Sequence, residues 1–165
     1  MEYWDAYDKD MHKIEGVTLR RGDPIPDGTY HLVADVLLRH VDGSILLMMR
    51  DPRKHFGGMW EATAGGSALV GEAPDQCAIR ELREETGVSV DSVSQVGVEV
   101  NDRNHTIYYE FCAVSDCDKD SVRLQVGETV AYRWVQKDEL IALRANELVT
   151  KRMFHYVEWL SDNGD

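Results

Sequence analysis

The chain has few cysteines, little positive charge and no long apolar run. No apolar stretch approaches the roughly 20 residues that span a bilayer, and Met1 to Asp5 contain no basic region followed by an apolar one. We therefore expect neither a membrane span nor a signal peptide. The three cysteines, Cys77, Cys112 and Cys117, are an odd number without metal-ligand spacing, which predicts free thiols in a reducing cytoplasm.

Positive charge is outnumbered: 18 Lys and Arg stand against 30 Asp and Glu, a formal net charge of −12. A surface with this much negative charge repels nucleic-acid backbones and anionic membranes. We therefore expect neither as a partner. A phosphorylated substrate would need its charge neutralised, and a divalent cation held by carboxylates would do this. The length of 165 residues suits one domain with a single core.

The order of predicted elements indicates one α/β domain. Residues 1–29 are interrupted by prolines and glycines, and we interpret them as an N-terminal arm packed on a domain of residues 30–165. Few helices among many strands favour a mixed sheet flanked by helices. The predicted strands are 30–39, 44–50, 60–64, 93–100, 106–114 and 130–135, and the predicted helices are 74–86, 137–143 and 148–160.

Three glutamates on the predicted helix are the strongest candidates for metal ligands. Glu81, Glu84 and Glu85 are three and four residues apart, so their side chains share one helix face. Crowded carboxylates repel one another unless a cation lies among them. Beside a glycine-rich turn they suit a hard cation, Mg²⁺ or Mn²⁺. The carbonyl oxygen of Gly66, in that turn, is a candidate for one more ligand.

Arg80 is placed to organise these carboxylates. It lies four residues before Glu84 and is expected to pair with it or to reach back to Glu72. Taken alone, the run from Arg80 to Glu85 would also fit a solvated helix face with ion pairs. The wider spacing of the segment decides between the two interpretations.

The segment from Gly66 to Val88 resembles the Nudix box. That motif is a glycine, five residues, a glutamate, seven residues, then Arg-Glu-aliphatic-any-Glu-Glu-any-Gly-aliphatic. Every specified position agrees: Gly66, Glu72, Arg80, Glu81, Leu82, Glu84, Glu85, Gly87 and Val88. The resemblance implies the Nudix fold, an α/β/α sandwich with a central mixed β-sheet, in which the box forms a loop-helix-loop.

The resemblance also implies a chemistry. Nudix hydrolases cut a phosphoanhydride bond in a nucleoside diphosphate linked to another group. By analogy, Glu81, Glu84 and Glu85 hold divalent ions, while Glu72 and Arg80 orient them. The ions neutralise the diphosphate and lower the pKa of a water that attacks phosphorus in line. A carboxylate takes the proton of that water, which makes Glu81 and Glu84 catalytic candidates as well.

Two residues outside the box join the expected site. Glu128 precedes the strand 130–135, and many Nudix proteins carry a functional glutamate in such a loop. Arg50 ends the strand 44–50 and is a candidate for binding substrate phosphates. For both, a solvated charge is the alternative. The expected partner is a small-molecule diphosphate, and since Nudix relatives are often dimers, a homodimer is also considered.

Motifs outside the box resemble the Nudix branch close to isopentenyl-diphosphate isomerase, among them Tyr30-His31-Leu32-Val33 and Gly58-Met59-Trp60-Glu61. The isomerases use a cysteine in the loop before the Nudix helix, whereas residues 61–68 contain neither cysteine nor histidine. Isomerase activity is therefore disfavoured. A non-catalytic binding module is disfavoured as well, because such modules typically lose glutamates of the box.

Overall fold

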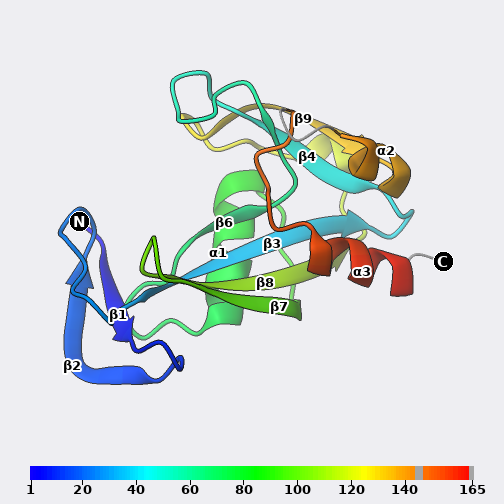
Figure 1. Ribbon diagram of the computed structural model, residues 1–165. Helices are drawn as coiled ribbons and strands as arrows, with labels where there is room; N and C mark the ends of the chain where they lie inside the picture. The colour runs from blue at the N-terminus through cyan, green and yellow to red at the C-terminus, as the bar shows by residue number, and fades with distance from the viewer. Residues whose placement is uncertain (144–146, 164–165) are drawn as a thin grey trace.

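The computed structural model describes residues 1–143 and 147–163 (Figure 1). Its strands are β1 (Tyr3–Tyr7), β2 (Lys13–Arg20), β3 (His31–His40), β4 (Ile45–Arg50), β5 (Trp60–Glu61), β6 (Ala64–Ser67), β7 (Ser94–Asn101), β8 (Thr106–Ser115) and β9 (Thr129–Val135). Its helices are α1 (Pro74–Thr86), α2 (Lys137–Ala142) and α3 (Phe154–Asp162), with a short 3-10 turn at Lys119–Ser121. None of the described helices is long and apolar enough to cross a bilayer.

The central sheet has seven strands and opens into two parts. β3 and β4 pair at Arg39 and Ile45, beside their connecting turn. Beyond that point β3 pairs with β6 and, in parallel, with β8, which in turn pairs with β7. β4 instead pairs with β5 and β9. Figure 1 shows β4 diverging from β3, and a hollow lined by residues of both parts of the sheet, among them Asp35 and Arg50, lies between them.

Helices cover both faces of the sheet. α1 packs on one face through Ala78 and Leu82, which are 0% and 1% exposed. On the opposite face, Leu140 of α2 and Tyr156 of α3 pack with apolar residues of β3 and β4. The predicted α/β/α sandwich around a mixed sheet is thus confirmed.

The box helix begins and ends as the sequence predicts. Pro74 occupies the first turn, where its missing N–H costs nothing. Gly87 ends the helix in the left-handed conformation, with φ of 73°, and its N–H donates to the carbonyl of Arg83. These two residues fix the stretch of helix on which the glutamates stand.

Two predicted elements are wrong in their bounds. The last helix begins at Phe154 and not at residue 148, because the backbone before it bonds to β5. The N–H of Trp60 donates to the carbonyl of Glu147 (2.8 Å), and the N–H of Val149 donates to the carbonyl of Trp60 (2.7 Å). The predicted strand 60–64 is two short strands, since β5 pairs with β4 while β6 pairs with β3.

The N-terminal arm is a two-stranded hairpin, which the sequence did not reveal. β1 pairs antiparallel with β2, around a small apolar cluster that includes Trp4 and Leu19. Two backbone hydrogen bonds join Tyr7 to Tyr30. The indole of Trp4 also stacks on the ring of His31, with centroids 4.3 Å apart. The hairpin is therefore attached at the start of β3.

Candidate active site

The guanidinium of Arg80 gathers the carboxylates of the box. Its Nε and Nη2 donate to the two oxygens of Glu72 at 2.7 and 2.8 Å. Its Nη1 donates to Glu81 at 2.6 Å and to Glu84 at 3.2 Å. A fifth hydrogen bond runs from Nη2 to the carbonyl of Ser67 (3.2 Å), which ties α1 to the end of β6. One cation thereby positions three carboxylates and the adjacent loop.

Gly66 lies directly against one of these carboxylates. A Cβ atom at position 66 would be 2.6 Å from Cδ and 2.8 Å from Oε2 of Glu81, so a side chain there would displace the carboxylate. The carbonyl oxygen of Gly66 accepts a weak hydrogen bond from the thiol of Cys77 at 3.4 Å. This carbonyl therefore faces α1, the helix that carries the glutamates.

Glu85 is the buried carboxylate of the group, at 9% exposure. Its Oε1 accepts a hydrogen bond from the N–H of Gly65 at 3.2 Å, and within the described residues no Lys or Arg forms an ion pair with it. Burial raises the pKa of Glu85 to about 8, the Gly65 N–H opposes this, and Glu61 and Glu81 raise it further. A negative charge is costly there unless another cation arrives.

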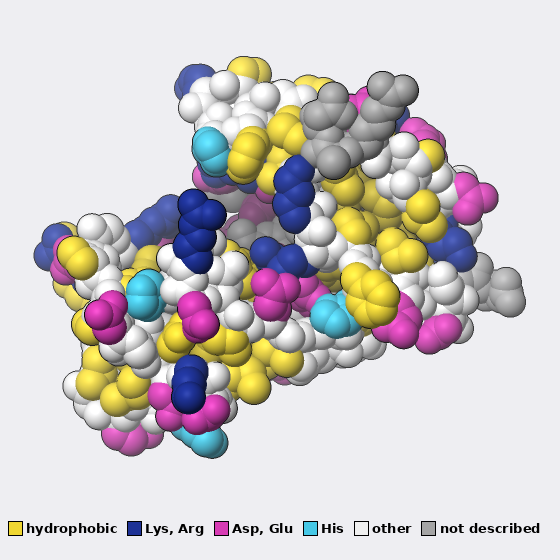
Figure 2. Space-filling model, in the orientation of Figure 1, with side chains coloured by type: hydrophobic (Ala, Val, Ile, Leu, Met, Phe, Trp, Pro, Cys, Tyr) yellow, Lys and Arg dark blue, Asp and Glu magenta, His cyan; other side chains and the backbone are white. Residues whose placement is uncertain are grey.

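Two cations from the other part of the sheet face Glu85 across the cleft. Arg50, at the end of β4, pairs with Glu61, and Lys54, in the following loop, pairs with Glu128. A hollow of about 200 Å³ lies between these two cations and Glu85. It is lined by Asp35, Arg50, Lys54, Glu61, Thr63, Gly65, Glu85, Glu128 and Thr129. Figure 2 shows the recess between the two parts of the molecule, with Lys and Arg side chains around its opening.

Of these residues, the sequence pointed to Arg50, Glu85 and Glu128 as site residues but not to Lys54. Lys54 reaches the site because its loop folds back on the loop before β9. The N–H of Asp51 donates to the carbonyl of Glu128 at 2.9 Å. Nothing in the local sequence around Lys54 indicates this long-range contact.

A second hollow, of about 380 Å³, adjoins the first. It shares Lys54, Gly65, Glu85 and Glu128 with the first and adds the outer face of the box, including Glu81 and Glu84. The N-terminal hairpin forms its far wall through Glu2, Trp4 and Arg21. The arm therefore borders the site and does not merely extend from the domain.

Asp35 is a largely covered carboxylate, with 18% of its side chain exposed, that the sequence did not point to. It lies in the middle of the apolar strand β3, which is itself a signal, since charged residues in such strands are rare unless paired. A Cβ at Gly65 would overlap its Oδ1, so Asp35 stands behind the same glycine that bonds Glu85. Burial raises the pKa of Asp35 to about 6, although Arg152 opposes the shift.

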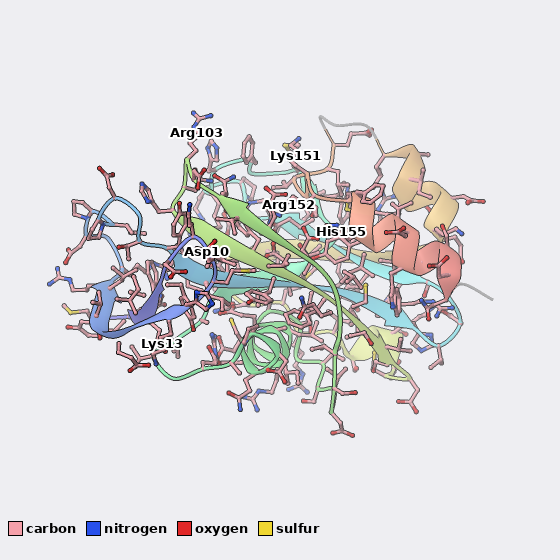
Figure 3. All side chains as sticks on the ribbon, turned by 60° about the horizontal axis from the view of Figure 1, so that its bottom comes forward. Asp10, Lys13, Arg103, Lys151, Arg152 and His155 are labelled. Atoms are coloured by element: carbon pink, nitrogen blue, oxygen red, sulfur yellow. The ribbon has the colours of Figure 1, made fainter. Side chains whose placement is uncertain are left out.

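Arg152 holds Asp35 from the side of α3. Its Nη2 donates to Oδ2 of Asp35 at 2.5 Å, and its guanidinium lies 3.7 Å from the ring centroid of Tyr108. Glu110 completes the group: it lies 3.3 Å from Nε of Arg152 and 2.5 Å from Nδ1 of His155. Figure 3 shows Arg152 and His155 on the same side of the sheet, where α3 begins. This network fixes the floor of the cleft.

The donor set suits a hard divalent cation. Within residues 1–143 and 147–163 no three His, Cys, Asp or Glu side chains converge closely enough to hold an ion as they are placed. Arg80 instead bonds both Glu81 and Glu84. Glu85, however, is a buried carboxylate with no ion-pair partner in the described residues, beside Glu81 and the Gly66 turn, and all these donors are oxygens. The residues fit a divalent-cation site in which Glu85 would be the deepest carboxylate.

The raised pKa of Glu85 predicts how metal and pH affect stability. A carboxyl whose pKa is raised on folding stabilises the fold below its unfolded pKa, near 4.5, and loses this as pH rises through about 8. In EDTA, Glu85→Gln should be more stable than wild type at pH 8 by roughly 2–4 kcal/mol, since each pKa unit is about 1.4 kcal/mol. Mg²⁺ should raise the Tm of the wild type more than that of the variant.

Thermal unfolding between pH 5 and pH 8, with EDTA or Mg²⁺, measures this effect. Glu139→Gln is the matched control, because Glu139 lies on the exposed side of α2 and pairs with Arg133. Superimposable pH profiles for wild type and Glu85→Gln would show that Glu85 carries no such penalty.

No cysteine of the chain lines either hollow. Cys77 is fully buried under Gly66, and burial raises the pKa of its thiol to about 12. A thiol with so high a pKa is a poor proton donor and a poor nucleophile near neutral pH. The structure thus offers no replacement for the loop cysteine of the isomerases.

Comparisons with known proteins identify the family of the chain. Residues 29–160 match the NUDIX domain family. An uncharacterized Nudix hydrolase of Listeria monocytogenes serovar 1/2a is 31% identical over 148 residues, which cover 88% of this chain and 86% of that protein. The isopentenyl-diphosphate Delta-isomerase of Corynebacterium diphtheriae is 23% identical over 139 residues, 78% of this chain and 76% of the isomerase. The predicted resemblance to the isomerase branch is thus confirmed at low identity.

The fold has solved counterparts. The NUDIX domain of Shewanella oneidensis NrtR, crystallised with ADP ribose, superposes with a TM-score of 0.64 over 82% of this chain and 89% of that chain. The two sequences are 17% identical, so this likeness concerns the fold.

Proposed function

Since this chain belongs to the NUDIX domain family and is a Nudix pyrophosphohydrolase, we propose that it uses Mg²⁺ to cut a nucleoside diphosphate linked to another group. The observation that carries this proposal is Glu85. It is a buried carboxylate with no ion-pair partner in the described chain, and it lies beside Glu81 and across the cleft from Lys54. A divalent cation would neutralise these carboxylates and a diphosphate together.

In the proposed reaction, Glu81, Glu84 and Glu85 would hold the ion, with the carbonyl of Gly66 as a further oxygen donor. When bound, Mg²⁺ neutralises diphosphate charge and increases the acidity of water. Arg80, itself fixed by the two hydrogen bonds that it donates to Glu72, would keep Glu81 and Glu84 oriented toward the Gly66 turn.

The opposite wall supplies the other roles. Arg50 and Lys54 bring positive charge to the cleft and would orient the phosphates. Glu128 borders both hollows and is 40% exposed in its side chain, so it can accept the proton of the attacking water and return it to solvent. A substrate phosphate that forms an ion pair with Lys54 would break the ion pair between Lys54 and Glu128, which would leave Glu128 able to accept this proton.

The substrate class is proposed from the shape and lining of the site. Two adjoining hollows, about 200 and 380 Å³, leave room for a group on each side of a diphosphate. The NrtR domain with the same fold was crystallised with ADP ribose, a compound of this type. We therefore place ADP-ribose and nucleotide sugars first among the candidates.

The test is an activity panel. Purified protein with Mg²⁺ or Mn²⁺ is incubated with ADP-ribose, nucleotide sugars, dinucleoside polyphosphates, nucleoside triphosphates and isopentenyl diphosphate, and the products are separated by chromatography. We expect cleavage of one diphosphate class to monophosphates, abolished by EDTA. Isomerisation of isopentenyl diphosphate without hydrolysis of any other compound would refute the proposal.

A further inference from the structure

A serine and a histidine lie beside the carboxylates of the box and are in contact with each other. Ser67 is the last residue of β6, next to Gly66, and it lines the larger hollow. Its hydroxyl lies 3.3 Å from Nδ1 of His31 in β3. Nε2 of the same ring lies 3.0 Å from the hydroxyl of Thr106 in β8. Ser67, His31 and Thr106 thus form a connected row of hydrogen bonds.

Thr106 sets which group donates and which accepts in each of these hydrogen bonds. Its hydroxyl has a single proton, and we assign this proton to the carbonyl of Asn104 at 2.9 Å, because a carbonyl can only accept whereas Nε2 of His31 can also donate. The contact with His31 must then be a hydrogen bond from Nε2–H to the Thr106 oxygen. Burial lowers the pKa of His31 to about 4, so the ring is neutral near pH 7 and carries only this one proton. Nδ1 is therefore an acceptor.

It follows that Ser67 donates its proton to His31. Both lone pairs of its oxygen remain available, and no donor of the described chain is bonded to them. The arrangement is held from several sides: Trp4 stacks on His31 with an interplanar angle of 18°, and Arg80 bonds the Ser67 carbonyl at 3.2 Å. Ser67 thus presents a fixed hydrogen-bond acceptor, and not a donor, to the hollow.

A fixed acceptor selects what lies against it. Phosphate oxygens near neutral pH have no proton to donate, and a prenyl chain has no polar group at all. A sugar hydroxyl has a proton to donate, and in a sugar diphosphate it lies one group away from the phosphates. Ser67 lies one residue from Gly66, where an added Cβ would meet the Glu81 carboxylate. A sugar bonded to a diphosphate at the carboxylates would therefore reach Ser67.

We propose that the Ser67 hydroxyl, oriented by His31, accepts a hydrogen bond from a sugar hydroxyl of the substrate and so favours diphosphates that carry a sugar over prenyl diphosphates. This inference rests on the proposed function for the identity of the reaction. The direction of the hydrogen bonds does not depend on it, and it can be tested separately.

The first experiment compares three substrates: ADP-ribose, its analogue without the 2′ and 3′ hydroxyls on the adenosine ribose, and the methyl ester of ADP, which lacks the second sugar. Ser67→Ala should lower kcat/KM for ADP-ribose about tenfold, the size of one hydrogen bond to a neutral group. For the analogue that lacks the hydroxyl bonded to Ser67, Ser67→Ala and the wild type should have the same kcat/KM. Ser161→Ala, at the exposed end of α3, is the control and should change nothing.

An equal loss for all three substrates, or no loss for any, would overturn the inference while leaving the proposed function intact. If the wild type cleaves none of them, calorimetric binding of the same three compounds replaces kinetics. Binding that depends on Ser67 would then keep the inference and count against the proposed function. Absence of both cleavage and binding would overturn the inference as well.

The second experiment reads the histidine directly. Long-range ¹H–¹⁵N spectra distinguish the two neutral tautomers of a ring. We expect His31 at pH 7 to be protonated on Nε2 and unprotonated on Nδ1, and Thr106→Val to disturb this preference. A proton on Nδ1 in the wild type would make Ser67 a potential donor and would refute the inference without any assay of activity.

Discussion

Replacing Glu84 by Gln should lower kcat about a hundredfold, which corresponds to about 2.7 kcal/mol of activation free energy. The change keeps the shape of the side chain but removes one of the three negative charges that would hold Mg²⁺. The Glu84 side chain is 44% exposed and receives a single hydrogen bond from Arg80, at 3.2 Å. The variant should therefore unfold at nearly the same temperature as the wild type.

Steady-state kinetics over a range of Mg²⁺ concentrations measures this prediction, on whichever substrate the panel identifies. Glu139→Gln, an equally exposed glutamate on α2, controls for loss of surface charge. A kcat for Glu84→Gln within about twofold of the wild type, a difference of roughly 0.4 kcal/mol, would mean that Glu84 is not a metal ligand.

Gly66→Ala should inactivate the protein without unfolding it. The new methyl group would lie 2.6 Å from Cδ of Glu81, and the end of that flexible side chain can move away. The fold then survives, but the carboxylate leaves its position beside the turn. We expect kcat/KM to fall between about tenfold and a hundredfold, with a loss in unfolding free energy below about 1 kcal/mol.

Gly65→Ala is the matched comparison, one residue earlier. Its methyl group would lie 2.5 Å from the carbonyl oxygen of Ala34, a backbone atom of the paired strand β3 that cannot turn aside. We expect this variant to lose roughly 2–4 kcal/mol of stability. Chemical denaturation of both variants, together with their kinetics, separates the two effects. Equal destabilisation by the two substitutions would contradict the role given to Gly66.

The sequence was most informative where function depends on local spacing. Glu81, Glu84 and Glu85 share a helix face because of their positions along the chain, and Pro74 and Gly87 define the ends of that helix. The main strands follow from apolar runs, because a strand buried between two layers of helices must be apolar over most of its length. For these parts, local chemistry is sufficient.

The sequence was least informative where contacts join distant segments. The exposed strand β2 has hardly any apolar alternation, so the N-terminal hairpin went unnoticed. Arg152 meets Asp35 across 117 positions and Lys54 meets Glu128 across 74, separations for which one sequence offers no spacing rule. The early start predicted for α3 failed for the same reason, since β5 binds the backbone that the helix would have used.

Arg80 would have a thermodynamic consequence for metal affinity. Its guanidinium already serves as the counterion of Glu81 and Glu84. Under the proposed function, binding of Mg²⁺ would be a competition between two cations for the same oxygens, and its affinity would be the difference between two large attractions. Such a site would bind its ion more weakly, and exchange it faster, than three unpaired carboxylates. Occupancy would then depend on the diphosphate, which would bring further oxygen ligands to the ion together with negative charge that Arg50 and Lys54 can accept.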